Sequence, residues 1–472
     1  MKSEERRMGN QRIRYGTAAL FFVLSISLYG ETSENILDGF DDSIESTSTT
    51  SETLKKEESS ASELDGFDDN NSSEIVENDL PSPSGFSGKI VQQVAYSYEG
   101  SEPHNNLTSL NSSLFLDYEK KFENGIKIKT NAKVYHNFIY DVRDENYKRG
   151  ELSAFRSEVE LFDAYVEGSL ADNIDIKIGR QVVVWGRSDT IRITDILNPL
   201  DNRRPGMVDI EDLRLPVTMA KLDYFIGDWR VAPIAILEQR FNKNPPYGSE
   251  FFPFPSPAPD EKSYYGSTFG LSVGGEFSGW DVNFYAARTR QEDGHVVLSA
   301  SGATIDHDKV NMFGSALNYL TGSWLIKSEL AYFDGLKYTS TQNETFTRVD
   351  GLVGLEYKGI ADTMFSYDFS VRHFNAYDGR LLNELSAFEE NNYQHAFRVT
   401  SDFLNATLHG NYLISLYGSK MNEGGFQRAW IKYDIADALS TNIGVVDYIG
   451  GSKMFDSIKD NDMLFVDVTY SF

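Results

Sequence analysis

A run of charged and apolar residues between Gly179 and Pro216 holds the side chains most suited to binding chemistry. Arginines lie close to several acidic residues there, among prolines and large aliphatic residues. Guanidinium and carboxylate groups form strong paired hydrogen bonds when water is excluded. The composition therefore predicts charged contacts that either bind a solute or fix the loop itself. The candidate residues are Arg180, Trp185, Arg187, Asn198, Asp201, Arg203, Arg204 and Arg214.

Two interpretations of this run fit the sequence. It either folds into the interior of the protein and narrows a passage, or it packs as a cap on the surface. We favour the inward loop, because a water-exposed loop has little reason to hold five large aliphatic residues between positions 191 and 200. In that case Arg203 and Arg204 are expected to meet carboxylates on the surrounding wall, such as Asp163 and Glu167.

The sequence does not indicate catalysis. Its seven histidines are scattered, and none pairs with a nearby serine or acid in a recognisable catalytic array. The chain has no cysteine, which removes thiol nucleophiles, disulfides and cysteine metal sites. Its formal charge of −27 disfavours nucleic acid as a partner. We therefore expect no enzyme activity, no cofactor and no metal.

The elements that position these residues are recognisable from position 85 onward. Aromatic and β-branched residues alternate with polar ones, in segments of about ten residues. Successive side chains of a strand point to opposite faces, so each segment has an apolar face and a polar one. This pattern is typical of a membrane β-barrel with an apolar exterior and a polar lumen. The residues predicted to face the lumen include Asp163, Glu167, Lys177, Lys327, Glu329, Asp350, Glu356, Asp368 and Arg372.

The segment that leads into the arginine-rich run breaks this alternation. Ile174, Ile176 and Ile178 share the lipid face, and the same face would place Arg180 in lipid. A β-bulge at Gly179 would turn Arg180 inward, because a bulge inserts one residue and shifts the pattern.

The connections between segments predict the topology. Very short connections such as Glu123–Gly125 and Thr321–Ser323 alternate with longer polar ones along the whole region. Bacterial barrels show this asymmetry, with tight periplasmic turns and longer outer loops. We therefore predict an all-β protein over residues 85–472. It is a transmembrane antiparallel up-and-down barrel of eighteen strands with both termini in the periplasm. A count of sixteen strands is the alternative, if one weak hairpin folds inward.

The first 84 residues have a different character. Residues 1–30 combine a basic start, an apolar run from Thr17 to Leu28 and small residues near a cleavage point, which predicts a signal peptide. A single anchor helix is the alternative. Residues 31–84 hold sixteen acids against two lysines, a net charge of −14, and predict a disordered periplasmic tail.

The acidic tail contains a six-residue motif, LDGFDD, in two copies. A phenylalanine among acids could dock on a periplasmic partner, and clustered carboxylates could bind Ca²⁺ loosely. We favour a third interpretation, a solvated spacer. The residues concerned are Leu37, Asp38, Gly39 and Phe40 in the first copy and Leu64, Asp65, Gly66 and Phe67 in the second.

The chain ends on an amphipathic strand. Leu464, Val466, Val468, Tyr470 and Phe472 share one face of it. A terminal phenylalanine after such a strand resembles the signal that outer-membrane barrels present to their assembly machinery. The assembly machinery and the lipids of the outer membrane are therefore expected partners.

One block of the sequence resembles a known family. The segments ELFDAYV from Glu160, GRQVVVWG from Gly179, DILNPLD from Asp195 and LRLP from Leu213 resemble the outer-membrane barrels called domain of unknown function 1302. The resemblance extends over residues 85–472, although only this block is specific. It implies a role beside inner-membrane transporters of the RND (MMPL) type, whose genes often accompany the family, and cargo that is hydrophobic or lipid-like. It carries no catalytic residues.

The leading functional hypothesis is an outer-membrane channel in the Gram-negative envelope with mixed charges along its lumen. Mixed signs argue against a strong filter for one ion. Two alternatives stay open, namely a substrate-selective nutrient porin and a plugged structural or adhesion barrel.

Overall fold

The computed structural model describes residues 85–472, apart from 144–146, 301 and 343. The predicted signal peptide and acidic tail, with both copies of the LDGFDD motif, lie outside the described residues. None of the helices in the described part of the chain is both long and apolar enough to cross a membrane.

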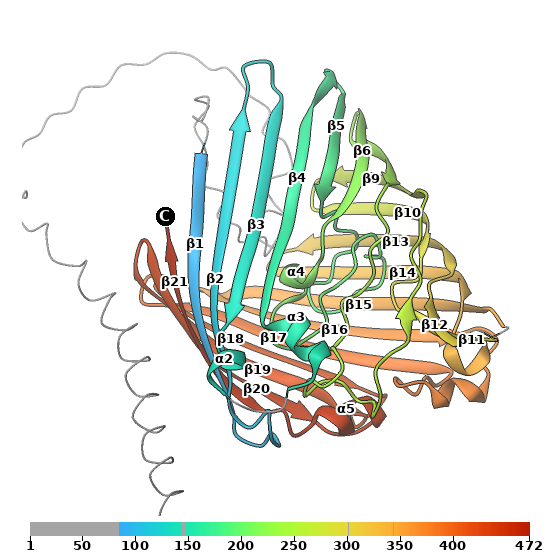
Figure 1. Ribbon diagram of the computed structural model, residues 1–472. Coiled ribbons are helices and arrows are strands. Elements are labelled where there is room, and N and C mark those ends of the chain that lie inside the picture. Colours follow the sequence, from blue (N-terminus) through green and yellow to red (C-terminus); the bar gives the residue numbers. More distant parts are fainter. Residues whose placement is uncertain (1–84, 144–146, 301, 343) are drawn as a thin grey trace, which may run out of the picture. The chain divides into compact units, whose positions relative to one another are not determined.

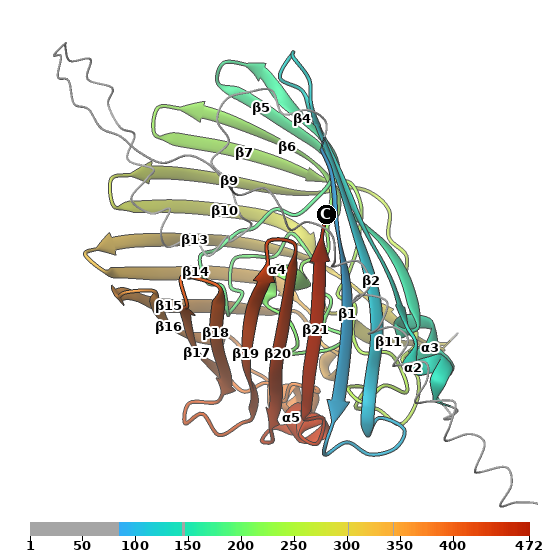
Figure 2. The same ribbon diagram turned by 90° about the vertical axis from the view of Figure 1, so that its left-hand side faces the viewer.

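Eighteen antiparallel strands of the described residues form one closed sheet (Figure 1). The last strand pairs with the first, from Lys89 opposite Ser471 to Ser97 opposite Met463, and Figure 2 shows the two side by side. Closure leaves no unpaired edge, which is what a sheet in lipid requires. The prediction of eighteen strands is therefore confirmed over the alternative of sixteen. The strands are β1 (Gly85–Ser97), β2 (Asn106–Lys121), β3 (Lys127–Asn137), β4 (Ser157–Ala171), β5 (Ile174–Gln181), β6 (Val217–Ile226), β7 (Trp229–Ile236), β9 (Thr268–Phe277), β10 (Trp280–Arg290), β13 (Lys309–Thr321), β14 (Trp324–Leu336), β15 (Phe346–Ile360), β16 (Thr363–Phe374), β17 (Asn391–Phe403), β18 (Leu408–Tyr417), β19 (Gly425–Ala436), β20 (Leu439–Ile449) and β21 (Met463–Ser471).

Short turns and long loops alternate around the barrel, as the sequence predicts. Tight turns such as those at Gly227 and Gly322 use a positive φ of 58°, which glycine adopts without a steric penalty. The long loops carry further short helices and strands, which the sequence pattern does not predict. These are α2 (Ile139–Val142), α3 (Arg149–Phe155), α4 (Ile210–Leu213), α5 (Lys453–Ile458), η2 (Thr339–Thr341), η3 (Gly379–Asn383), and a small sheet of β8 (Asp260–Glu261), β11 (His295–Ser299) and β12 (Gly302–Asp306).

The two faces of the barrel wall follow the predicted register. On β15, Val353 and Leu355 are exposed on the outside, whereas Asp350 and Glu356 are buried on the inside. The exterior carries large exposed apolar side chains on many strands, including Leu330 on β14. An apolar exterior around a polar interior is the arrangement of a membrane barrel.

The register predicts a large difference between two matched valine substitutions. Val353 lies on the outer face of β15, whereas Val91 of β1 lies on the face of the buried Ala95 and Ser97. Val353→Arg should destabilise the barrel in lipid vesicles by about 2–4 kcal/mol, because it places a charge in hydrocarbon. Val91→Arg should cost much less. Denaturant titration of both variants measures this, and equal losses would contradict the register.

The C-terminal residue completes the closure. Phe472 exchanges two backbone hydrogen bonds of 2.9 Å with Gly88, and its ring lies over the same glycine. A side chain at position 88 would clash with that ring, since a Cβ there would lie 2.6 Å from it. The role of Phe472 as an assembly signal stays a prediction.

Candidate functional site

The connection between β5 and β6, residues 182–216, runs through the interior of the barrel, and we call it the lumen loop. Figure 1 shows this green segment and α4 within the ring of strands. Its hydrogen bonds reach β14 and β16, across the ring from β5 where the loop begins. The prediction that this run folds inward is confirmed, and the surface cap is excluded.

The apolar residues of the lumen loop form a core with the inner faces of the strands. Ile191, Ile193 and Leu197 are almost fully buried, and they pack in one cluster with residues of β6 and β13 such as Met219 and Met312. Burial of each such side chain stabilises the folded loop by about 1.5–3 kcal/mol. The loop is therefore a packed part of the barrel.

Glu329 of β14 is the most extensively bonded anchor of the lumen loop. Its Oε1 accepts the backbone N–H of Arg187 at 2.7 Å and that of Ser188 at 3.0 Å. Its Oε2 accepts the backbone N–H of Thr194 at 3.1 Å and the Thr194 hydroxyl at 2.8 Å. The carboxylate thus satisfies three backbone donors that would otherwise be buried without a partner. Gly186 has a φ of +94°, and a Cβ there would lie 2.8 Å from this carboxylate, so glycine permits the approach.

Two further wall residues hold the same part of the loop. Asp368 Oδ2 accepts hydrogen bonds from the hydroxyls of Ser188 and Thr190, both at 2.6 Å. Lys327 Nζ lies 2.9 Å from Asp189 and also pairs with Glu356. Four of the predicted lumen-facing residues therefore form one group that holds the lumen loop against the wall. They are Lys327, Glu329, Glu356 and Asp368.

The start and end of the lumen loop are joined by polar contacts of its own. Asn198 accepts the Val183 N–H at 2.8 Å and donates to the carbonyls of Gln181 and Leu215 at 3.3 and 2.9 Å. Asp195 pairs with Arg192 at 3.2 Å and with Arg214 at 2.8 Å.

The remaining predicted residues of this part of the loop contact the wall. Trp185 stacks on Tyr285 of β10, with ring centroids 4.7 Å apart. Arg187 pairs with Asp281 of the same strand. Arg372 of β16 donates to the Arg192 carbonyl at 3.2 Å and lies 3.7 Å from Asp350. The loop is thus bonded to the wall from β10 to β16.

The partners predicted for Arg203 and Arg204 are wrong. Arg203 pairs with Glu158 at 2.7 Å and with Asp201 at 2.5 Å, and Arg204 lies over the ring of Phe155 at 4.7 Å. Burial opposes the charge of Arg203, but hydrogen bonds to these two carboxylates raise its pKa overall. The loop lies against the end of β4 that follows the long β3–β4 connection, whereas Asp163 and Glu167 occupy positions farther along the strand.

The predicted bulge at Gly179 is also wrong. The pairing of Ile178, Gly179 and Arg180 is continuous on both sides of β5. Gly179 instead adopts a φ of +132°, and Arg180 lies 3.0 Å from Glu160. The register shift occurs on β4, which places two residues opposite Asn131 of β3.

This backbone conformation predicts a specific cost for a small substitution. A Cβ at position 179 would lie 2.2 Å from the Ala164 carbonyl oxygen, so the positive φ and the close approach both require glycine. Gly179→Ala should destabilise the barrel by about 1–3 kcal/mol. Gly351→Ala on β15 is the control, since nothing lies within 4 Å of its Cβ position. Denaturant unfolding that does not distinguish the two variants would contradict the assignment.

A strip of mixed charges lines the inner face of β2 to β5, and we call it the charged wall. Lys127 pairs with Glu167 at 2.7 Å, and Lys129 lies 3.8 Å from Asp117. Side chains of these pairs are 22–35% exposed, so water reaches them. The charged wall also contains Asp163, which accepts a hydrogen bond from Asn131 at 3.2 Å, and Lys177, whose Nζ lies 3.7 Å from the centre of the Tyr165 ring.

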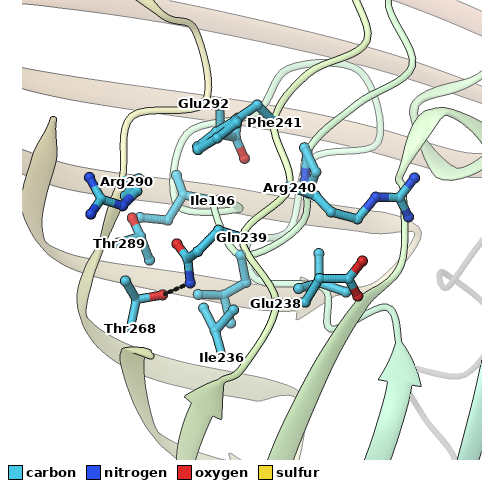
Figure 3. A pocket seen from close by; sticks show the side chains of 13 residues that line it. Ile196, Ile236, Glu238, Gln239, Arg240, Phe241, Thr268, Thr289, Arg290 and Glu292 are labelled. Carbon is cyan, nitrogen blue, oxygen red and sulfur yellow. Dashed lines mark hydrogen bonds between the residues drawn. The ribbon is translucent and has the colours of Figure 1, made fainter. Parts of the chain in front are cut away.

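A small cavity lies where the lumen loop meets the β7–β9 connection. Figure 3 shows Phe241 and Glu292 above the aliphatic side chain of Ile196, with Arg290 and Arg240 on either side of it. Burial raises the pKa of Glu292 to about 7, against the opposing charge of Arg192, which lies 3.2 Å away. The cavity has a volume of about 20 Å³, which suits a water molecule better than a larger solute.

Several residues that fasten the lumen loop are not predicted from the sequence. Glu160 and Lys243 extend the charge network at the start of β4, with Lys243 Nζ 2.7 Å from Glu160. Arg428 of β19 pairs with Asp209, and Tyr448 of β20 donates to the Pro205 carbonyl at 2.6 Å. Alternation of Glu158 and Glu160 with Val159 and Leu161 could have revealed Glu160 as a residue of the inner face. The contacts of Arg428 and Tyr448 join residues more than 200 positions apart in the chain, for which the sequence holds no local signal.

Known proteins share the barrel fold. OccK9 (OpdG) of Pseudomonas aeruginosa aligns with a TM-score of 0.51 at 9% identity, over 82% of this chain and 98% of that one. OccAB3 of Acinetobacter baumannii aligns with a TM-score of 0.50 at 11% identity, over 82% and 99%. The outer membrane protein OpdK of Pseudomonas aeruginosa aligns at 0.48 and 10% identity, over 83% and 99%. For OccK9 and OccAB3, identities this low show the fold alone.

Sequence comparisons add a family. The profile described as a protein of unknown function (DUF1302) matches residues 71–472. No match to the chain is found among curated proteins.

Proposed function

Because the chain belongs to the DUF1302 family, we propose that it is an outer-membrane channel. Its cargo is hydrophobic or lipid-like, and it works in concert with an inner-membrane transporter of the RND type. The long loops face outward, and both termini lie in the periplasm. One combination of features supports the channel function. The lumen loop is bonded to one side of the barrel wall, while water reaches the charged wall.

The geometry supports a narrowed passage. The lumen loop is bonded to β10, β14 and β16 through Arg187, Glu329 and Asp368, so it packs against that part of the wall. The charged wall on β2 to β5 keeps partly exposed side chains, which favours a water-filled path beside it. A loop folded into a barrel and held by ion pairs sets the size of the passage.

The cargo class and the transporter rest on the family resemblance. Aromatic rings also lie beside the lysines of this path, with Lys133 Nζ 4.9 Å from the centre of the Phe115 ring. Such a surface offers apolar and cationic contacts together, which suits a molecule with an acyl or aromatic part and an acidic head group. Passage from the periplasm outward fits a partnership with an inner-membrane pump.

A nutrient porin is the second candidate, and a specific observation favours it. The charged wall pairs lysines with acids along its length, so it also suits small polar solutes of either charge. A plugged structural barrel is the third candidate, and it predicts no conductance at all.

A cellular experiment separates these candidates. A strain that lacks the chain should release less of a lipophilic fluorescent probe, and wild-type chain should restore release only while the RND-type transporter is present. Restored uptake of a small sugar with no effect on the probe would favour the nutrient porin. Purified protein that shows no conductance in planar bilayers would exclude both channel functions.

A further inference from the structure

Three long loops bring a histidine and two glutamates together at the outer-loop end of the barrel. His104 lies in the β1–β2 loop, Glu151 in α3 of the β3–β4 loop, and Glu250 in the β7–β9 loop. One ligand atom from each residue lies within 4.8 Å of the others. The cluster lies outside the lumen loop, and the channel proposed above does not use it.

The distances within the cluster are close to those of a metal site. His104 Nε2 lies 2.8 Å from Glu151 Oε1 and 3.8 Å from Glu250 Oε2. A metal with bonds of about 2.0–2.2 Å to nitrogen and oxygen ligands holds such atoms a little over 3 Å apart. The two distances from His104 lie on either side of this value, so small side-chain rotations would bring the three atoms around one ion.

Glu151 supplies a second, independent indication of a ligand. Its side chain is fully buried, and its Oε1 already accepts hydrogen bonds from His104 and from the Tyr140 hydroxyl at 3.2 Å. Its Oε2 is also buried but accepts no hydrogen bond from the described residues. A buried carboxylate oxygen without a partner is costly, and coordination of a cation by both oxygens of Glu151 would remove that cost.

We propose that His104, Glu151 and Glu250 bind a divalent transition-metal ion of the Zn²⁺ type, which fastens the three loops together. Two carboxylates and a neutral imidazole carry a charge of −2, which balances the ion. The imidazole nitrogen favours Zn²⁺ over Ca²⁺ and Mg²⁺, which prefer oxygen ligands only. Three protein ligands leave a further position for water.

The surrounding contacts hold the ligands in place. Arg143 donates to the carbonyls of Asn105 and Leu107 at 2.7 and 3.0 Å, so it fixes the loop that carries His104. Tyr140 fixes Glu151 through its hydroxyl. The three ligands are 47 and 99 positions apart along the chain, which is why no motif in the sequence marks the site.

Metal binding by the purified full-length protein tests the proposal. Protein treated with a chelator and then titrated with Zn²⁺ in a calorimeter should bind one ion per chain. His104→Gln and Glu151→Gln should weaken binding by at least about tenfold, as losses around zinc sites generally do. Glu250→Gln, at a ligand less buried than Glu151, provides a third variant that should fold normally. Heat-modifiable migration on a gel reports whether each variant folds.

His295→Gln is the matched control, because His295, the first residue of β11, is also a buried histidine beside an acid, 3.6 Å from Asp308, yet lies outside the cluster. It should bind Zn²⁺ as the wild type does. No binding by folded wild-type protein would overturn the proposal. The proposal would also be overturned if all three folded ligand variants bound Zn²⁺ as tightly as the wild type. The same holds if His295→Gln were the only variant with reduced affinity.

Discussion

Deleting residues 191–206 should raise the single-channel conductance several-fold. This segment holds Ile191, Ile193 and Leu197, which fill the space between the lumen loop and the inner strand faces. It also holds Thr194, which is bonded to Glu329, and Arg203, which is bonded to Glu158. Without the segment the lumen loses the material that narrows it, and cells should also become permeable to bulkier solutes.

A deletion of similar kind in another long loop controls for general damage. The hairpin of β11 and β12 lies in the β10–β13 connection and belongs to a separate small sheet. Its removal should leave conductance near the wild-type value. Two results together would show that the lumen loop does not set the width of the passage. The 191–206 deletion would leave conductance unchanged, and external protease would cleave the lumen loop of the wild-type protein on intact cells.

Glu329→Ala should release the lumen loop from the wall of an otherwise intact barrel. The substitution leaves the backbone donors of Arg187, Ser188 and Thr194 without their acceptor. Each buried donor left unsatisfied costs about 1–3 kcal/mol, so the loop loses on the order of 3 kcal/mol or more. Planar-bilayer recordings should show larger and noisier currents than those of the wild type.

Glu167→Ala is the control for this loss of charge. Glu167 also faces the lumen, but its partners are Lys127 and Lys177 of the wall. It should change conductance modestly and without added noise. If the currents of Glu329→Ala were as small and as free of noise as those of the wild type, the carboxylate would not hold the loop.

Strand count and register could be predicted because each depends on the pattern of residues that are close together in the sequence. Alternation places Lys327 and Glu329 on the inside and Leu330 and Tyr332 on the outside, and the structure confirms all four. Short and long connections repeat with the strands, so the topology follows without knowledge of distant contacts. The family resemblance, drawn from the block around the lumen loop, is confirmed as well.

The partners of individual charges could not be predicted, because they depend on how far the loop travels inside the barrel. From the sequence, several lumen carboxylates are candidate partners for Arg203. In the structure its wall partner is Glu158, and not Asp163 or Glu167. Gly179 shows a related limit. A break in alternation is visible in the sequence, but a bulge and a positive φ leave the same signature there.

Thiol labelling of the charged wall tests the central claim most directly, since the natural chain has no cysteine. Lys129→Cys places a thiol on the charged wall, where the native side chain is 29% exposed beside Asp117. Val166→Cys, on the outer face of the neighbouring strand β4, is the control. A membrane-impermeant thiol reagent should reduce the single-channel current of Lys129→Cys and leave that of Val166→Cys unchanged. An unaffected current from Lys129→Cys would show that the passage does not run along the charged wall.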